Sequence, residues 1–95
     1  MSEWHVYLIR TRYGALYTGI ATDAMRRLAE HRGTGKKGSR YLRSKGPLQL
    51  VYSAKIGNHA LALKVEGFIK KLSKRKKEAI IEEGLTAKAL LKLLL

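Results

Sequence analysis

Two strand-like runs, joined by a short turn and followed by a helix, fill the first third of the chain and constrain its fold most. The alternation of apolar and polar residues predicts strands over residues 4–11 and 15–21. Gly14 stands at the third position of the turn, where a three-residue hairpin loop needs a positive φ. This register sets Tyr7 opposite Gly19 and Ile9 opposite Tyr17, so both phenols share one face of the hairpin.

The helix after the hairpin has Thr22 or Asp23 as its N-cap and Gly33 as the residue that ends it. Helical spacing separates a polar stripe from an apolar side. The polar stripe comprises Asp23, Arg27 and His31, and the apolar side comprises Met25, Leu28 and Ala29. A phenol pair, a guanidinium and an imidazole are therefore expected to reach the surface close together.

The charge of the chain points to a polyanionic partner. Twenty Lys and Arg against seven Asp and Glu give a net charge of +13 in 95 residues, which repels itself unless an anion binds. Nucleic acid is the first choice, and an acidic membrane surface is disfavoured because no long apolar run accompanies the charge. Without cysteine there is no disulfide or thiolate metal site. The length predicts a single domain over residues 1–95, and the lack of a signal-peptide pattern predicts a cytoplasmic protein.

Two basic segments are candidates for phosphate contacts. The first is a Gly-rich loop over residues 32–46, in which cations surround a ring that can stack on a base. Its candidate nucleic-acid-binding residues are Lys36, Lys37, Arg40, Tyr41, Arg43 and Lys45. The second is the run from Lys74 to Lys77 at a predicted helix start. Either segment could instead be a solvated surface.

A third strand is predicted over residues 48–55, with Leu48, Leu50, Tyr52 and Ala54 on one inward face. Asn58 then caps a helix that runs to about residue 72. Its apolar stripe comprises Leu61, Val65, Phe68 and Leu72. Glu66 projects from the edge of that stripe, in a helix that also carries Lys64, Lys70 and Lys71. We expect Lys70 and Lys71 to contribute to nucleic-acid binding.

Two more helices complete the chain. Ser73 begins the third helix and Gly84 ends it, and Thr86 caps a last helix whose leucines serve the core or a dimer contact. The order β-β-α-β-α-α-α predicts an α+β fold, a small three-stranded antiparallel sheet flanked by helices. We expect a monomer or a weak homodimer.

The hairpin and the first helix resemble the GIY-YIG nuclease superfamily. His5, Val6 and Tyr7 stand for its first signature, and Tyr17, Thr18 and Gly19 stand for its second. Arg27 lies ten residues after the second Tyr, and the resemblance continues through His31 to Glu66, over about three quarters of the chain. Among the branches, the chain is most similar to the small stand-alone bacterial members, and eukaryotic junction-resolving nucleases have a similar pattern.

The resemblance implies one catalytic site formed by Tyr7, Tyr17, Arg27, His31 and Glu66. Glu66 would bind Mg²⁺ or Mn²⁺, because one carboxylate suffices for an ion that keeps several waters. Its alternative role is an ion pair with Lys70. Arg27 would clamp the phosphate, or else pair with Asp23.

The other three residues have proton-transfer and orienting roles in this interpretation. Tyr7 would accept a proton from the attacking water if nearby cations lowered its pKa, and Tyr17 would orient that water. Packing of both rings is the alternative. His31 would orient Tyr7 or assist proton transfer, or else be a surface histidine.

Three departures from the superfamily pattern keep a second hypothesis open. His5 replaces the usual Gly of the first signature, Ile20 replaces a common Lys, and no Asn follows Asn58. The first hypothesis is a divalent-metal-dependent endonuclease for DNA, branched or single-stranded, in DNA repair or processing, with RNA as a further substrate. The second is a non-catalytic basic DNA- or RNA-binding module with the same fold.

Overall fold

A computed structural model describes residues 3–32, 42 and 45–94. Three strands and four helices follow one another in the predicted order, and the α+β class is confirmed. The elements are β1 (Trp4–Arg10), β2 (Leu16–Ala21), α1 (Ala24–Arg32), β3 (Gln49–Gly57), α2 (His59–Lys70), α3 (Lys74–Glu83) and α4 (Ala87–Leu93).

The β1–β2 hairpin has the register that the turn predicts. The Thr11 amide donates to the Ala15 carbonyl at 2.9 Å, and Gly14 has a φ of 82°. Tyr7 pairs with Gly19, and Ile9 pairs with Tyr17. The two phenols therefore lie on one face of the hairpin.

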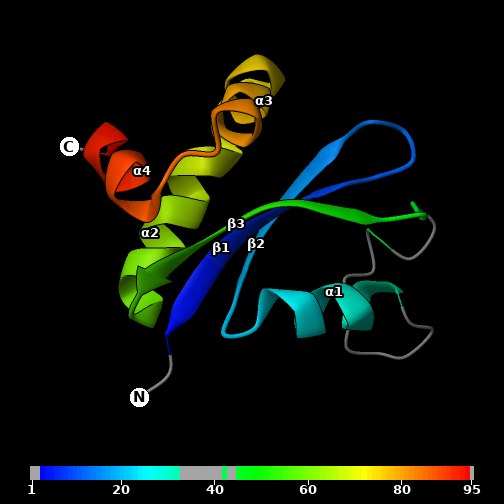
Figure 1. Ribbon diagram of the computed structural model, residues 1–95, viewed down its shortest axis with the longest axis horizontal. Coiled ribbons are helices and arrows are strands. Elements are labelled where there is room, and N and C mark those ends of the chain that lie inside the picture. The colour runs from blue at the N-terminus through cyan, green and yellow to red at the C-terminus, as the bar shows by residue number, and fades with distance from the viewer. Residues whose placement is uncertain (1–2, 33–41, 43–44, 95) are drawn as a thin grey trace.

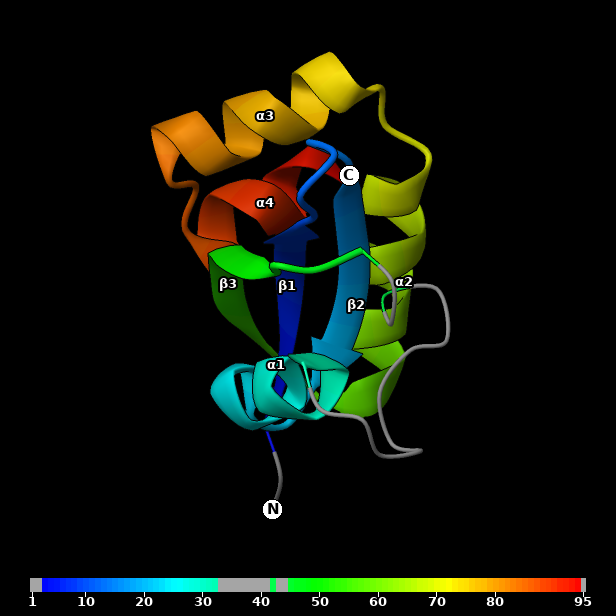
Figure 2. The same ribbon diagram turned by 90° about the vertical axis from the view of Figure 1, so that its right-hand side faces the viewer.

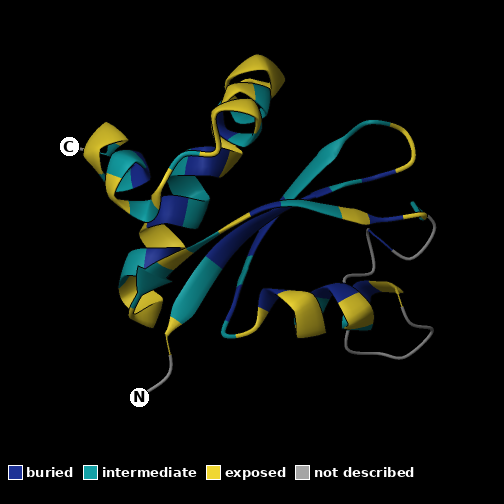
Figure 3. Cartoon of the chain, in the orientation of Figure 1, coloured by how far each residue is buried: buried dark blue, intermediate teal, exposed yellow. Residues whose placement is uncertain are grey.

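The antiparallel sheet has the order β2-β1-β3 and is covered on both faces (Figure 1). On one face, Tyr7, Ile9, Leu28, Leu42 and Leu48 form a buried cluster beneath α1. The other face carries the larger cluster, which receives side chains from α2, α3 and α4. Colouring by burial shows the buried positions along β1 between these layers (Figure 3). With β1 in the centre, β2 and β3 are the edge strands.

The prediction that alternate residues of the third strand share one face is wrong. Leu48 and Leu50 pack on the α1 side, whereas Tyr52 and Ala54 pack on the α2 side. The reason is a register shift in β3: Leu8 pairs with Tyr52, but the next residue, Ile9, pairs with Leu50. An extra residue at such a bulge moves the following side chains to the opposite face.

The predicted caps of the described helix ends are confirmed, whereas Gly33, the predicted end of α1, lies outside the described residues. The side chains of Asn58, Ser73 and Thr86 accept from the amides three residues later, and Gly84 ends α3 with a φ of 59°. For α1 the N-cap is Asp23, whose carboxylate accepts from the Arg26 amide at 3.0 Å. The N-caps therefore fix the first residues of these helices at the positions that the sequence predicts. In the part of the chain that the structure describes, no helix is long and apolar enough to cross a membrane.

The apolar side predicted for α1 is partly wrong. Met25 and Ala29 are exposed, and the buried residues of the helix are Ala24, Leu28 and His31. These three follow an i, i+4, i+7 spacing, so the face that packs on the sheet is turned by one residue from the predicted one. His31 is thereby buried rather than placed at the surface.

Candidate active site

A buried hydrogen bond joins the first strand to the first helix. The Tyr7 hydroxyl lies 3.0 Å from Nε2 of His31, and both residues are 2% exposed. Central strand β1 fixes Tyr7, and the last turn of α1 fixes His31. A phenol and an imidazole, 24 residues apart in the sequence, are thus held together in a water-poor environment.

Gly19 leaves the room that the Tyr7 ring occupies. A Cβ atom at position 19 would lie 2.6 Å from Cζ of Tyr7, and closer still to its hydroxyl oxygen. Because Gly19 faces Tyr7 across the hairpin, the missing side chain lets the ring lie over β2. The register therefore determines where the phenol goes.

The protonation state of the pair follows from its burial. Burial raises the pKa of Tyr7 to about 12, with a further increase from Tyr17, while Arg27 opposes the shift. Burial also lowers the pKa of His31, and Arg27 adds to that decrease. At neutral pH both groups are uncharged, and the tautomer of His31 determines which of them donates in this hydrogen bond. The idea that cations lower the pKa of Tyr7 below its usual value is wrong, since desolvation outweighs Arg27.

Arg27 lies beside this pair but has a different partner from the one its spacing suggests. Its guanidinium donates to the Glu30 carboxylate at 2.8 Å, and it also interacts with the Tyr7 hydroxyl. The alternative pair with Asp23 does not form, because the Asp23 carboxylate caps the helix instead. Arg27 is about one third exposed, so the guanidinium is held at the Tyr7 oxygen and still faces solvent.

Tyr17 completes the aromatic surroundings of His31. Its ring meets the imidazole edge-on, with ring centroids 5.5 Å apart and planes at 71°. The Tyr7 and His31 ring centroids are 6.2 Å apart. Tyr17 lies on edge strand β2 and is half-buried, so it borders the pair on the side that solvent can approach. His31 also lines a cleft of about 360 Å³ with Arg32, Leu42 and Leu48 among its other walls.

Glu66 reaches this region from α2. The helix runs alongside β2 (Figure 2), and the Glu66 side chain is 18% exposed. Its charge contributes to the raised pKa of Tyr7, so the carboxylate acts electrostatically on the phenol. Nζ of Lys70 lies 3.6 Å from Glu66 Oε2, which is a long ion pair with a half-exposed lysine. That pair leaves carboxylate oxygens able to meet another cation.

The predicted nucleic-acid-binding residues are only partly described. Lys36, Lys37, Arg40, Tyr41 and Arg43 lie outside the described residues. The Lys45 ammonium lies 5.4 Å from the ring centroid of Tyr13, at the tip of the hairpin. Lys71 is the exposed C-cap residue of α2. Among the described members of this set, Lys70 lies beside a candidate catalytic residue, Glu66.

Sequence reasoning missed two residues that position the site. Glu30 holds the Arg27 guanidinium, and its signal was the i, i+3 spacing on the helix. Arg32 donates twice to the Leu48 carbonyl, at 3.2 and 2.7 Å, and ties the end of α1 to the chain entering β3. No sequence pattern indicates the second contact, because it spans 16 residues and uses a backbone acceptor.

Comparisons with known proteins identify a family model, related sequences and a solved structure that this chain resembles. Residues 3–79 match the model of the GIY-YIG catalytic domain. A UPF0213 protein of Citrobacter koseri is 50% identical over 91 residues, which cover 96% of this chain and 89% of the relative. The UPF0213 protein YhbQ of an Escherichia coli strain is 49% identical over 84 residues, which cover 88% of this chain and 82% of the relative. A solution NMR structure of a UPF0213 protein from Bacillus halodurans superposes with a TM-score of 0.54 at 35% identity, and covers 84% of this chain and 83% of that one.

Proposed function

The chain belongs to the family of the GIY-YIG catalytic domain, and from this premise we propose that it is an endonuclease that hydrolyses phosphodiester bonds in DNA. Branched or single-stranded DNA is the substrate that we favour, with RNA as a further substrate and a role in DNA repair or processing. The observation that carries the proposal is the buried hydrogen bond between Tyr7 and His31, with Arg27 at the phenol oxygen. The net charge of +13 supports a nucleic-acid partner.

Arg27 and Glu66 would manage the charge of the reacting phosphate. The Arg27 guanidinium stays protonated and can donate to two phosphate oxygens. Glu66 fits a divalent ion that keeps most of its waters, because it is a largely buried carboxylate whose ion pair with Lys70 is long. Mg²⁺ or Mn²⁺ held there would neutralise charge on the phosphate and on the departing oxygen.

Tyr7 and His31 would move the proton of the attacking water. The proposal requires the His31 tautomer with its proton on Nδ1, in which the neutral Tyr7 phenol donates to Nε2 and still has lone pairs to accept a hydrogen bond from water. As the water oxygen bonds to phosphorus, its proton passes to the Tyr7 oxygen and the Tyr7 proton passes to Nε2 of His31. His31 then carries the positive charge, and the bond from phosphorus to the departing oxygen breaks. Tyr17 would orient the water on the solvent side.

The test compares Glu66→Gln with the matched control Glu82→Gln, which removes the same charge from an exposed site on α3. Cleavage of labelled DNA in Mg²⁺ should fall by at least about 10²-fold in Glu66→Gln and stay unchanged in the control. Binding should persist in both. The ion pair with Lys70 is long and half-exposed, so its loss should cost less than about 0.5 kcal/mol of stability.

Two outcomes would contradict this proposal. Full cleavage by well-folded Glu66→Gln would rule out Glu66 as the metal ligand. Binding without cleavage by the wild-type protein, across DNA and RNA substrates in Mg²⁺ and Mn²⁺, would favour the non-catalytic binding module.

A further inference from the structure

A basic groove begins at the candidate active site and runs along the outer edge of β2. Its walls come from β2, the end of α2 and the start of α3, and its volume is about 260 Å³. The lining residues are Leu16, Tyr17, Thr18, Lys70 and Lys77. Two of them belong to the site described above, since Tyr17 contacts His31 and Lys70 pairs with Glu66.

The charged residues that line this groove are both lysines, although Lys70 also pairs with Glu66 at 3.6 Å. Lys70 and Lys77 bring ammonium groups from two different helices, and no acidic residue lines the groove. Lys77 differs from the rest of its basic run, because it is half-buried while Lys74, Arg75 and Lys76 are exposed. Lys77 lies one helical turn before buried Ile80, so its stem packs inward while its ammonium group lines the same groove as Lys70. The arrangement favours an anion between them.

The groove also contains a polar group without a partner. Thr18 is 3% exposed, and its hydroxyl has no hydrogen-bond partner among the described residues. Because β2 pairs only with β1, backbone groups on its outer side are also open to a ligand. The Thr18 hydroxyl oxygen is itself buried, so the donors within reach of a ligand are the edge backbone amides and the ammonium groups, both of which proteins use to contact nucleic-acid phosphates.

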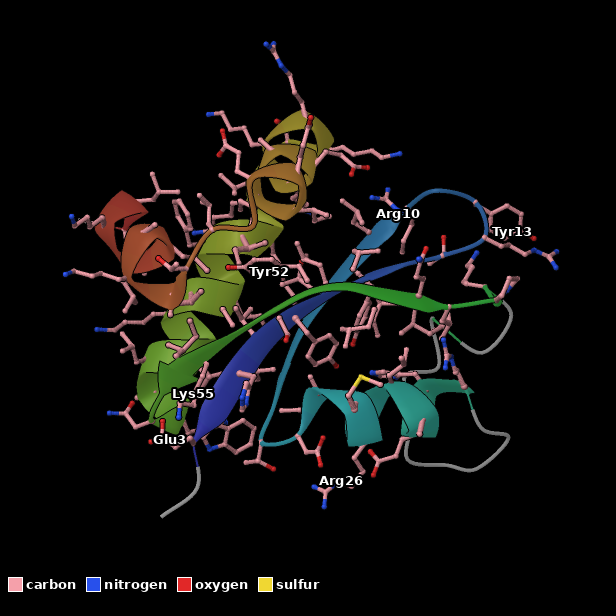
Figure 4. The ribbon with its side chains drawn as sticks, in the orientation of Figure 1. Glu3, Arg10, Tyr13, Arg26, Tyr52 and Lys55 are labelled. Atoms are coloured by element: carbon pink, nitrogen blue, oxygen red, sulfur yellow. The ribbon has the colours of Figure 1, made fainter. Side chains whose placement is uncertain are left out.

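An ion pair fixes the α3 side of the groove. Arg10 on β1 donates to both carboxylate oxygens of Glu78, at 2.6 and 2.7 Å, and Glu78 follows Lys77 in α3. Figure 4 shows Arg10 on the hairpin below α3, with Tyr13 farther out at the hairpin tip. Nζ of Lys74 lies 3.6 Å from the position that a Cβ of Gly14 would take. The start of α3 is therefore held against the hairpin, and the positive charge continues from Lys77 toward the tip.

We propose that this groove is a second phosphate subsite, which binds a backbone phosphate next to the one that Arg27 and Glu66 engage. Lys77 is its principal ligand, and Lys70 links it to the active site. The strand being cut then runs from the phenols along the edge of β2 toward the hairpin tip. This inference rests on the proposed nuclease function for the identity of its ligand, but its test is a binding measurement that needs no cleavage.

The experiment compares Lys77→Gln with Lys88→Gln, an equal charge change at an exposed position on α4. Affinity for a single-stranded and a duplex oligonucleotide is measured from about 50 to 200 mM salt. Loss of one phosphate contact should reduce the slope of log affinity against log salt by about 0.7 on single strands and about 0.9 on duplex. Between about 50 and 200 mM salt, the ratio of wild-type affinity to Lys77→Gln affinity should therefore fall about threefold. Lys88→Gln should keep the wild-type slope.

A chemical change in the ligand locates the contact. Oligonucleotides with one neutral methylphosphonate, moved along the strand, should show one position at which wild type loses affinity and Lys77→Gln loses none. Equal losses in both proteins at every position, or equal salt slopes for the two variants, would overturn the subsite.

Catalytic outcomes separate the subsite from the proposed function. Lys77→Gln should slow cleavage of polynucleotide but not hydrolysis of bis(p-nitrophenyl) phosphate, which has no neighbouring phosphate. If wild type cleaves neither substrate, the nuclease proposal fails, and the binding slopes still decide the subsite. If wild type binds no nucleic acid, both proposals fail.

Discussion

Gly19→Ala should uncouple the phenol of Tyr7 from His31, although it adds only one methyl group. The new Cβ would lie 2.6 Å from Cζ and 3.0 Å from Cε1 of Tyr7. The ring cannot move freely, because Tyr7 is 2% exposed and its hydroxyl is bonded to His31. Gly19 has no left-handed φ, so backbone strain contributes nothing. The loss of stability therefore comes only from steric overlap between the new methyl group and the Tyr7 ring.

The magnitude follows from the two ways in which the protein can respond. Forcing the methyl group into the packed site costs about 1–3 kcal/mol. Turning the ring away instead breaks a buried hydrogen bond, which costs about the same. For a domain of this size each kcal/mol lowers Tm by about 4–8 °C, so a decrease of at least about 4 °C is expected. Cleavage should fall by up to about 10²-fold, since a displacement near 1 Å can have that effect.

Gly67→Ala is the matched control, because it adds the same methyl group in the interior of α2. No atom lies within 4 Å of a Cβ at position 67. Glycine in a helix interior is about 0.5–1 kcal/mol less stable than alanine, so this variant should melt at a higher temperature than wild type. Stability is measured by thermal and urea unfolding, and turnover on the same preparations.

A double-mutant cycle isolates the contact itself. Tyr7→Leu removes the ring atoms that the new methyl group would meet. In the Tyr7→Leu background, Gly19→Ala should lower the free energy of unfolding by less than about 0.5 kcal/mol, because the clash between the methyl group and the ring is absent. The close approach of Tyr7 to β2 would be refuted if Gly19→Ala lowered the free energy of unfolding as much in the Tyr7→Leu background as in the wild type. A wild-type Tm and turnover for Gly19→Ala alone would refute it as well.

Three further predictions follow from the charges. Because neutral His31 must accept a proton, kcat/KM should rise with pH through a value below 6.5 and then level off, and His31→Gln should lose that rise in a pH–rate profile. Arg10 lowers the pKa of Glu78 in the folded protein. Their partly exposed ion pair should therefore contribute up to about 1 kcal/mol to the free energy of unfolding above pH ~4.3, the usual pKa of a glutamate. This contribution should disappear as the pH falls through the lowered pKa of Glu78. Urea unfolding should therefore show Glu78→Gln less stable than wild type at pH 7 and equal to it near pH 2. Replacing Lys36, Lys37, Arg40 and Arg43 by Ala should flatten the salt slope of DNA binding by about 0.9 per lost contact, and an unchanged slope would refute that loop as the binding surface.

Local signals in the sequence were enough for most of the backbone. A glycine at the third loop position and the alternation of side chains determine the hairpin register, and with it the pairing of Tyr7 with Gly19. The caps at Asn58, Ser73 and Thr86 likewise depend on atoms within four residues. Such features are predictable because the groups that decide them are neighbours in the chain.

The side-chain details of the candidate site depend on packing between distant segments, and here sequence reasoning failed. The bulge in β3 sends Leu48 and Leu50 to the α1 side, where they help to bury the surroundings of His31. An i, i+4 spacing offered an Asp23–Arg27 pair as the alternative to a phosphate clamp at Arg27, but the Asp23 carboxylate caps the helix and Glu30 pairs with Arg27 instead. Neither outcome can be read from one helix in isolation.

The burial that the sequence does not reveal changes the chemistry available to the site. Desolvation raises the pKa of Tyr7 and lowers that of His31, so both shifts favour the uncharged pair at neutral pH. A phenol with a pKa of about 12 is a poor base on its own, but one bonded to a neutral imidazole can take a proton and release another in the same step. Arg27 lies at the Tyr7 oxygen and disfavours a protonated His31. In the proposed reaction, an anionic phosphate that engaged that guanidinium would weaken its effect on His31, so substrate binding itself would make the imidazole a better final acceptor.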